Sequence, residues 1–408
     1  MLSKMINQPI FNIGCLGSVS DGKSTLVYQL TGIKTQKHSN EKHRNITIKQ
    51  GYGNMKIWEN ENQYYTTDGC VDNYKNIMDE NCILANHISF VDCPGHLELI
   101  QTMLASISLM DGAIIIIAVD QPLAKKPQLI QHLAAAKLKG IDKIIVCMNK
   151  IDLVSKETLL LRKNELDIML EEYNIKPFNI IPTCFNKKIG LDHLISSIML
   201  LFNNNIKKIG PSYFRVSRSF DINKPGTDIM DIKGGVLGGS LMTGEFKVGD
   251  TIEIRPGQIV KNKSGDYDSI PITTKIISLQ TDTKQLDAIG SGCLFGIGTD
   301  LDPYYCKNDG LSGSVVGHSN FMPDVYNEVK MNVTIVTMFG GKWIPKNGDS
   351  IYLQLGTKSC EARLLKFKDN YYHFKLMKPA CIDSKEHIII TKSHLKTMTI
   401  VGEGYLWL

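Results

Sequence analysis

The segment Gly17–Ser24, which reads G-S-V-S-D-G-K-S, constrains the fold of this chain more than any other stretch. It matches the pattern G-x-x-x-x-G-K-[ST], in which backbone N–H groups surround phosphate oxygens. The apolar run Ile10–Leu16 precedes it, and a helical pattern begins at Lys23. A strand, a glycine loop and a helix in this order turn the positive end of the helix dipole toward the phosphates. The sequence therefore predicts a phosphate-binding loop (P-loop), in preference to an ordinary glycine turn between a strand and a helix.

Each residue type in this loop suits a role in holding a nucleotide. Gly17 and Gly22 stand where a Cβ would keep the backbone away from the phosphates. Lys23 is expected to reach the β- and γ-phosphates, and the Ser24 hydroxyl is expected to bind Mg²⁺. The residues of this segment that we expect to contact the nucleotide are Ser20, Asp21, Gly22, Lys23, Ser24 and Thr25.

A second motif, D-C-P-G-H, begins at Asp92, directly after the apolar run Ile88–Val91. A carboxylate at the end of such a strand is typical of the acid that holds Mg²⁺ in P-loop enzymes. Gly95 is expected to bring its N–H close to the γ-phosphate. A lone histidine is more often structural, but the place of His96 directly after D-x-P-G favours a catalytic role in orienting the attacking water.

A third motif, N-K-I-D at Asn149–Asp152, also follows an apolar run. The Asp152 carboxylate can accept hydrogen bonds from the N1–H and N2–H₂ groups of guanine, a donor pair that adenine lacks. Asn149 is expected to brace the loop and contact the base, and the stem of Lys150 to pack on the base. Because the three motifs occur in this order, the sequence predicts a GTPase domain that binds GTP or GDP with Mg²⁺ and selects guanine over adenine.

Composition limits the class of protein. A chain of 408 residues predicts two or three domains, and a net charge of +5 permits an RNA partner without arguing for one. No segment reaches about 18 uninterrupted apolar residues, so we expect no membrane span. The first ten residues carry no hydrophobic signal core. The ten cysteines include no C-x-x-C pair, which favours reduced thiols in a cytoplasmic protein.

The chain changes character near residue 208. Before it, apolar strand-like runs alternate with helical patterns, which predicts a doubly wound, mostly parallel sheet with the nucleotide at the carboxyl ends of its strands. The expected strands are Ile10–Leu16, Ile88–Val91, Ala113–Val119, Ile144–Met148 and Asn179–Pro182. The expected helices are Lys23–Leu30, His96–Ser108, Lys126–Lys139, Glu157–Tyr173 and Leu191–Leu201.

After that point, short β-rich runs are separated by Gly, Asp and Asn, and helical periodicity disappears. This pattern predicts two β-barrels. Turns of the second barrel are expected at Gly340-Gly341, Asn347-Gly348 and Lys368–Asn370. We therefore predict an α/β P-loop GTPase domain at residues 1–207, a β-barrel at 208–320 and a second β-barrel at 321–408.

This order of domains resembles the translational GTPases, such as elongation factor Tu. Within that class it is most similar to the γ subunit of eukaryotic and archaeal translation initiation factor 2. The resemblance is specific from about Phe11 to Gly317 and looser beyond Tyr326. The stretches that carry it are R-N-I-T-I-K-Q-G-Y at Arg44–Tyr52, S-F-V-D-C-P-G-H at Ser89–His96, R-S-F-D-I-N-K-P-G at Arg218–Gly226, K-G-G-V-L-G-G-S at Lys233–Ser240 and G-I-G-T-D-L-D-P-Y-Y-C at Gly296–Cys306.

The resemblance implies roles for residues outside the three motifs. Thr47 would be the switch I threonine, which closes over Mg²⁺ and the γ-phosphate and serves hydrolysis. Tyr52 would line the groove for the aminoacyl end of tRNA, although a buried strand tyrosine is an equal alternative. Cys184, Phe185 and Asn186 would form a further guanine-contacting loop, in which the Phe185 N–H bonds guanine O6.

The resemblance also implies partners. The family delivers initiator methionyl-tRNA to the small ribosomal subunit in its GTP state and releases it when GTP is hydrolysed. It works as the core of a heterotrimer with α and β subunits. Separate GTPase-activating and nucleotide-exchange proteins assist it.

Three departures from the family pattern affect these expectations. Members usually carry a four-cysteine zinc site in the region of residues 54–86, where this chain has only Cys70 and Cys82; zinc is therefore not expected, and a two-cysteine site completed by His87 is the alternative. Asp21 replaces a histidine and puts a carboxylate near the triphosphate, which would weaken binding unless Mg²⁺ or a lysine compensates. Phe185 replaces a small residue, so its ring must point away or pack on the nucleotide.

Two other functions stay open from the sequence. One is an elongation-type GTPase for a special aminoacyl-tRNA, such as the selenocysteine-specific factor, although that family usually carries an additional C-terminal extension. The other is a GTP-binding scaffold or regulator with little hydrolysis, which His96 and Thr47 argue against. Stimulated hydrolysis on ribosomal subunits would separate the scaffold from a factor, because unassisted GTPases are slow in any case.

Overall fold

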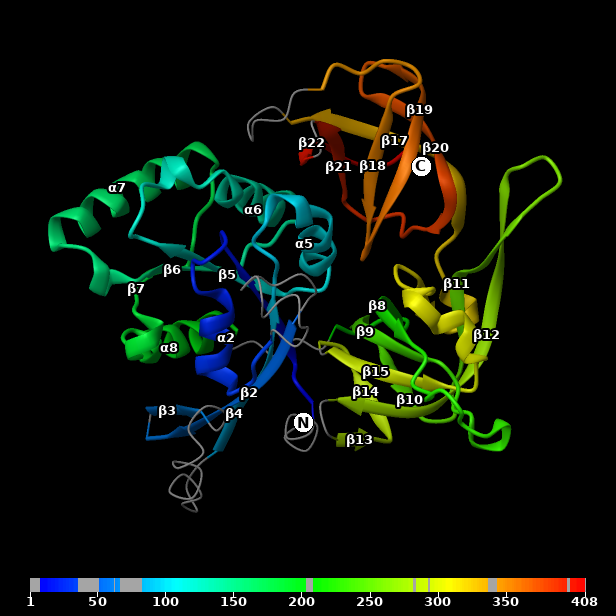
Figure 1. Cartoon of the computed structure of the whole chain (residues 1–408), viewed down its shortest axis with the longest axis horizontal. Coiled ribbons are helices and arrows are strands. Elements are labelled where there is room, and N and C mark those ends of the chain that lie inside the picture. The colour runs from blue at the N-terminus through cyan, green and yellow to red at the C-terminus, as the bar shows by residue number, and fades with distance from the viewer. Residues whose placement is uncertain are drawn as a thin grey trace. The chain divides into compact units, whose positions relative to one another are not determined.

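The computed structural model describes residues 8–35, 51–61, 63–66, 83–202, 208–281, 284–292, 294–336, 343–394 and 397–407. Thr47, Cys70 and Cys82 lie outside this part of the chain. Contacts divide the chain into two compact units (Figure 1): Met1–Asn205 with Lys396–Met398, and Ile206–Leu395 with Thr399–Leu408. The two units are described separately below.

The first unit contains a seven-stranded sheet in the order β3-β2-β4-β1-β5-β6-β7. Five of its strands run parallel to one another, and the central three, β1, β5 and β6, are fully buried, as expected for a sheet covered on both faces. The five strands are β4 (Ile83–Asp92), β1 (Phe11–Leu16), β5 (Gly112–Ala118), β6 (Ile144–Asn149) and β7 (Asn179–Pro182). All five strands that the sequence predicts are therefore present. Four differ from the prediction by at most one residue at either end, whereas β4 begins at Ile83, five residues before the predicted start at Ile88.

Helices cover both faces of this sheet (Figure 1). One face carries α2 (Lys23–Thr31) and α8 (Leu191–Leu201), and the other carries α5 (Ile100–Ile107), α6 (Pro127–Leu138) and α7 (Lys156–Glu172). Leu26 and Leu194 anchor the first pair in the core beneath the sheet. The helix expected at His96–Ser108 begins at Ile100, because the chain first makes a 3₁₀ turn at Leu97–Leu99.

Two strands at one edge of the sheet are absent from the prediction. These strands, β2 (Gly51–Asn60) and β3 (Gln63–Thr66), form an antiparallel hairpin, and β2 also pairs antiparallel with β4. Alternate residues of β2 are buried from Gly51 to Ile57. This alternation is typical of an antiparallel strand with one face on the core and one in water.

The first barrel of the second unit closes through six strands in the order β11-β16-β8-β9-β15-β12, with β12 pairing back to β11. Phe214, Leu237 and Ile254 are fully buried in its core. The six strands are β8 (Tyr213–Phe220), β9 (Val236–Thr243), β11 (Thr251–Lys261), β12 (Tyr267–Thr281), β15 (Leu294–Thr299) and β16 (Val315–Gly317). The short strands β10 (Glu245–Lys247), β13 (Lys284–Leu286) and β14 (Ala288–Gly290) accompany them.

The second barrel closes through six strands in the order β17-β20-β19-β18-β21-β22. These are β17 (Val325–Ile335), β20 (Tyr371–Cys381), β19 (Lys358–Lys368), β18 (Ser350–Leu355), β21 (Ile388–His394) and β22 (Thr397–Leu406). The turns predicted at Asn347-Gly348 and Lys368–Asn370 are present, and Gly340-Gly341 lies outside the described residues. An α/β domain followed by two β-barrels confirms the predicted fold class. The residue ranges of the three domains stay a prediction.

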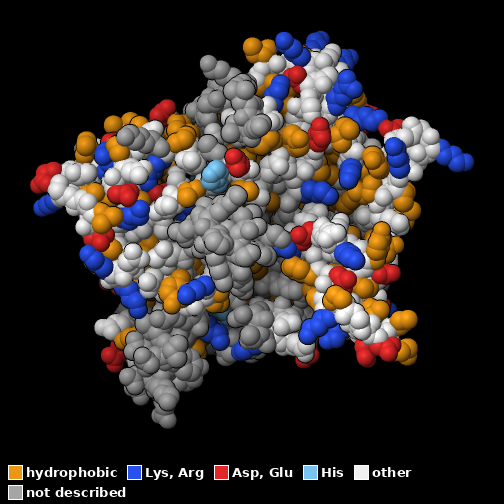
Figure 2. Space-filling model, viewed as in Figure 1, with side chains coloured by type: hydrophobic (Ala, Val, Ile, Leu, Met, Phe, Trp, Pro, Cys, Tyr) orange, Lys and Arg blue, Asp and Glu red, His pale blue; other side chains and the backbone are white. Residues whose placement is uncertain are grey.

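Charges are mixed over the surface. On the face drawn in Figure 2, lysine and arginine side chains alternate with acidic and hydrophobic ones over the residues that the structure describes. This agrees with the mild net charge of +5. None of the described helices is both long and apolar enough to cross a membrane.

Candidate nucleotide-binding site

The P-loop joins β1 to α2 at the carboxyl edge of the parallel strands. Gly17 has φ +147°, and a Cβ there would lie 2.2 Å from the Ile116 carbonyl oxygen. Gly22 has φ +106°, and its Cβ would lie 2.4 Å from Asn149 Nδ2. Ser20 also has a positive φ, of 64°. The two motif glycines are therefore required by backbone geometry and by close neighbours, and the loop is held tightly against the ends of β5 and β6.

Lys23 lies inside this loop. Its ammonium donates to the Ser18 carbonyl oxygen at 2.7 Å, and the residue is 6% exposed. Burial lowers the pKa of Lys23, while the charges of Asp92 and Asp21 act in the opposite direction. A largely desolvated ammonium in a cradle of backbone amides suits the binding of phosphate oxygens.

Asp92 brings oxygen ligands together beside the P-loop. Its Oδ2 accepts hydrogen bonds from Ser24 Oγ and from Thr35 Oγ1, each at 2.6 Å. A carboxylate and hydroxyls are hard oxygen ligands of the kind that Mg²⁺ prefers, so this set fits the ion. The structure thus joins Ser24 to Asp92 as expected. It also adds Thr35, which no motif in the sequence marks, whereas Thr47 lies outside the described residues.

Gly95 lies against the P-loop. A Cβ on this residue would stand 2.5 Å from Lys23 Nζ and 2.9 Å from the Gly17 carbonyl oxygen. The segment after β4 therefore passes directly over the loop, which suits a backbone N–H that approaches a terminal phosphate. The next residue, His96, is exposed to solvent. The role expected for it, orienting an attacking water molecule, requires this exposure.

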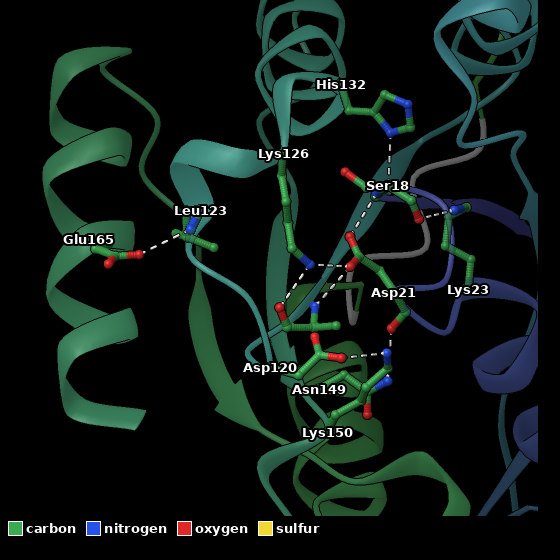
Figure 3. A network of polar contacts seen from close by, with 12 residues as sticks. Ser18, Asp21, Lys23, Asp120, Leu123, Lys126, His132, Asn149, Lys150 and Glu165 are labelled. Carbon is green, nitrogen blue, oxygen red and sulfur yellow. Dashed lines mark hydrogen bonds and ion pairs between the residues drawn. The ribbon is translucent and has the colours of Figure 1, made fainter. Parts of the chain in front are cut away.

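Asn149 connects the P-loop to the loop after β7. Its Nδ2 donates to the Asp21 carbonyl oxygen at 2.8 Å, and its Oδ1 accepts from the Phe185 N–H at 3.2 Å. The neighbouring Lys150 has φ +65°, and its ammonium lies 3.0 Å from Asp120 Oδ2. These contacts bring the N-K-I-D segment and the loop of residues 184–186 together at one end of the site. Figure 3 shows the contacts of Asn149 with Asp21 and of Lys150 with Asp120.

The Asp152 carboxylate is held in its ionised form. Hydrogen bonds from Cys184 and then Lys187 lower the pKa of Asp152. The Lys187 ammonium lies 3.0 Å from Asp152 Oδ2. An ionised carboxylate is a pure acceptor, which is what two N–H groups on one edge of guanine require.

Phe185 keeps its ring inside the protein. The side chain is 1% exposed and packs in the core cluster that contains Leu26 and Leu194. A Cβ on Gly22 would lie 3.4 Å from a Phe185 ring carbon, so the ring lies beneath the P-loop. Of the two expectations for this bulky residue, the ring pointing away is the one observed. Asn186 follows it and is exposed.

The Asp21 carboxylate is paired with a lysine. Lys126 Nζ contacts Asp21 Oδ1, and both side chains are buried. The lysine compensation that the sequence left open is therefore present, supplied by a residue 105 positions away. No sequence pattern marks Lys126, because the contact depends on how β5 and the start of α6 lie against the P-loop.

Tyr52 and His87 lie on the paired strands β2 and β4. Tyr52 is half-buried in β2, opposite Val91 of β4. His87 is buried in β4 opposite Lys56. Among the described residues, no three His, Cys, Asp or Glu side chains gather as a metal site. Cys70 and Cys82 lie outside those residues, so the two-cysteine alternative stays untested.

Comparison with known proteins decides the family. Residues 8–204 match the family described as "Elongation factor Tu GTP binding domain". The eukaryotic translation initiation factor 2 subunit gamma of Encephalitozoon cuniculi is 33% identical over 415 residues, which cover 99% of this chain and 94% of the relative. The translation initiation factor 2 subunit gamma of Methanocaldococcus jannaschii is 36% identical over 411 residues, covering 98% of each. The chain belongs to the family of translation initiation factor 2 γ subunits. It is thus a GTP-binding GTPase of translation initiation, as its motifs predict.

Solved structures agree on the fold of this γ-subunit family member. The bacterial selenocysteine-specific elongation factor EF-Sec superimposes with a TM-score of 0.74 at 21% identity, covering 97% of this chain. The chain spans 58% of the length of that protein. Elongation factor SelB from Methanococcus maripaludis, in complex with the GTP analogue GPPNHP, gives a TM-score of 0.73 at 19% identity and covers 98% of this chain and 80% of its own. At these identities the likeness extends to the fold alone.

Proposed function

We propose that this chain binds initiator methionyl-tRNA in its GTP state, delivers it to the small ribosomal subunit and releases it when GTP is hydrolysed. The observation that carries the proposal is the full-length match to γ subunits at 33–36% identity, in a chain whose nucleotide site is assembled. The Ser24–Asp92 contact and the Asn149 link between two loops support that assembly. The proposed partners are α and β subunits, a GTPase-activating protein and a nucleotide-exchange protein, in the cytoplasm.

The residues of the site have separate proposed roles in binding. The P-loop amides from Ser20 to Thr25 and the Lys23 ammonium hold the phosphates. Ser24, Asp92 and Thr47 hold Mg²⁺, which when bound neutralises charge on the β- and γ-phosphates. Asp152 accepts from the guanine edge, with Asn149 and Lys150 beside the base and residues 184–186 closing the loop.

Hydrolysis depends on two further residues in this proposal. His96 lies next to Gly95, whose backbone abuts Lys23, and its exposed ring orients the attacking water. Thr47 senses the γ-phosphate and relaxes with its loop when that group leaves. An activating protein stimulates the step, because unassisted enzymes of this class turn over slowly. Tyr52 contributes to the tRNA groove.

The test is a hydrolysis-protection assay with methionylated initiator tRNA, elongator methionyl-tRNA and other aminoacyl-tRNAs, each in GTP and in GDP. Protection of the initiator species in GTP, and much weaker protection in GDP, is the expected result. Preference for another aminoacyl-tRNA would indicate an elongation-type factor. Bound GTP with no protection of any aminoacyl-tRNA would indicate a scaffold or regulator. Stimulation of hydrolysis by small ribosomal subunits tests the release step separately.

A further inference from the structure

The carboxylate of Asp21 lies between the Ser18 backbone of the P-loop and Lys126, beside the end of β5 (Figure 3). Its Oδ1 accepts from Lys126 Nζ and from the Ala118 N–H, the second at 3.1 Å. Its Oδ2 accepts from the Ser18 N–H at 2.8 Å. The Asp21 residue is 1% exposed. The carboxylate therefore fastens two parts of the P-loop to each other and to the end of β5.

Lys126 is as enclosed as its partner. It precedes α6, is 6% exposed, and donates to the Ala118 carbonyl oxygen at 2.8 Å as well as to Asp21. A buried ammonium loses its hydration, so it is stable there only with a well-placed anion and further acceptors. This lysine is thus tied specifically to the P-loop carboxylate and is not a surface lysine in a chance ion pair.

The charges of Asp21 and Lys126 explain how this ion pair affects nucleotide binding. A GTP molecule brings several negative charges to the P-loop, and a carboxylate within the loop repels them. Buried charges are screened by salt much less than exposed ones, so the repulsion by Asp21 alone would persist at physiological ionic strength. Lys126 supplies the opposite charge next to that carboxylate.

We propose that Lys126 is a positioning residue for the guanine nucleotide: it cancels the charge of Asp21, so that this carboxylate does not repel the phosphates. The inference rests on the proposed nucleotide site and adds a residue that lies in none of the three motifs. It also explains how this chain tolerates an acid where the family pattern has a histidine.

A second contact, from α6 itself, also reaches the P-loop. His132 Nδ1 accepts a hydrogen bond from the Gly17 N–H at 2.8 Å, at the start of the P-loop. Burial, and to a lesser degree the charge of Lys23, lowers the pKa of His132 to about 3, so the ring stays a neutral acceptor. The α6 segment thus holds the P-loop at two points, through Lys126 at Asp21 and through His132 at Gly17.

The test compares Lys126→Met, Asp21→Asn and the double variant by titration with fluorescent GTP and GDP, together with thermal unfolding of each protein. Lys126→Met leaves an unpaired carboxylate, and we expect it to weaken binding roughly 100-fold. Asp21→Asn leaves an unpaired positive charge, and we expect it to tighten binding roughly tenfold. The double variant is expected to fall between the two single variants.

The opposite signs of these changes distinguish charge balance from mere structural support. Both single variants break the same ion pair, so a purely structural role would weaken binding in both, in step with the loss of thermal stability. That result would overturn the proposal. If Lys126→Met fails to fold, Asp21→Asn still tests the proposal. Weaker or unchanged nucleotide binding in Asp21→Asn would contradict the charge argument.

Lys163→Met is the matched control. Lys163 lies on α7 in an exposed ion pair with Asp167 at 2.6 Å, so the substitution removes the same charge far from the P-loop contacts. We expect no change in nucleotide affinity for this variant. Equal affinities for the Lys126 and Lys163 variants would refute the inference while leaving the nucleotide site intact. Failure of the unmodified chain to bind GTP or GDP would instead refute the proposed function.

Discussion

Phe185 illustrates how a single residue can depart from a family pattern without disturbing the site around it. Its backbone stays in the loop, where the N–H reaches Asn149 Oδ1, and only its ring enters the core. A larger side chain is accepted because the loop residue points toward the interior beneath Gly22 and away from the base-binding side. The change therefore alters the packing below the P-loop and leaves the polar groups of residues 149–152 in place.

The guanine preference depends on one carboxylate. Asp152→Asn is expected to weaken GTP binding and to strengthen binding of xanthosine triphosphate, because an amide can pair with the altered donor and acceptor pattern of xanthine. Competition titrations with both nucleotides measure the effect. Asp142→Asn, which changes an exposed carboxylate before β6, serves as the control. An unchanged preference for GTP in the Asp152 variant would contradict the assignment.

The proposed catalytic role of His96 separates hydrolysis from binding. His96→Ala is expected to leave GTP affinity nearly intact and to lower ribosome-stimulated hydrolysis about 10²-fold or more, as when a transition-state contact is lost. Single-turnover measurements with bound GTP give the rate directly. His193→Ala, on the exposed side of α8, should hydrolyse GTP normally. Normal turnover in the His96 variant would remove this histidine from the mechanism.

At the scale of elements, the end of β4 and the P-loop approach each other too closely for a side chain between them. Gly95→Ala would place a Cβ 2.5 Å from Lys23 Nζ, and either the ammonium or the backbone would have to move. Overpacking of this kind costs about 1–3 kcal/mol, so nucleotide affinity is expected to fall roughly tenfold or more. Gly296→Ala is the control, since its Cβ would meet Val236 at 3.6 Å and the Gln280 carbonyl oxygen at 3.9 Å, both ordinary contacts. Equal affinities in the two variants would show that the approach is looser than described.

Sequence patterns predicted those elements whose signal is local. A few consecutive residues are enough to identify the P-loop, the N-K-I-D segment and each parallel strand. The sequence therefore predicted the central sheet and the candidate residues in these motifs. The hairpin of β2 and β3 was missed because a strand with only one buried face, such as β2, carries a weaker signal than a fully buried run such as β5.

Sequence patterns could not predict contacts between residues that are far apart in the chain. Thr35 bonds Asp92 across 57 positions, and Lys126 meets Asp21 across 105. Neither threonine nor lysine is unusual in its local setting, so no pattern distinguishes these two from other residues of their type. Only the arrangement of β1, β4 and β5 side by side brings them to the P-loop.

At the scale of the whole molecule, the two barrels of the second unit are joined by a buried ion pair. Arg215 Nη2 of β8 lies 3.1 Å from Glu386 Oε1, and their side chains are 15% and 3% exposed. The same Glu386 oxygen accepts from the Gly356 N–H at 2.7 Å, and Thr357 Oγ1 donates to the Val216 carbonyl oxygen at 2.6 Å. These contacts link one barrel to the other through side chains and backbone together.

Removal of one partner should destabilise the second unit strongly. Glu386→Ala removes the carboxylate that pairs with the buried Arg215 guanidinium, and loss of one partner of a buried ion pair costs about 3–5 kcal/mol. Urea denaturation followed by tryptophan fluorescence measures the shift. Glu361→Ala is the control, because this glutamate is exposed and the change is expected to stay within about 0.5 kcal/mol. Equal midpoints for the two variants would mean that the barrels do not depend on this pair.

The strand order described for the two units has a consequence for the behaviour of the chain at high concentration. The seven-stranded sheet ends on both sides in four-residue strands, β3 and β7, and β7 finishes at Pro182. Both barrels close on themselves through six strands. Long, open strand edges are the templates on which foreign chains add and aggregates grow. The part of this chain that the structure describes therefore offers little open strand edge on which its own copies can polymerise.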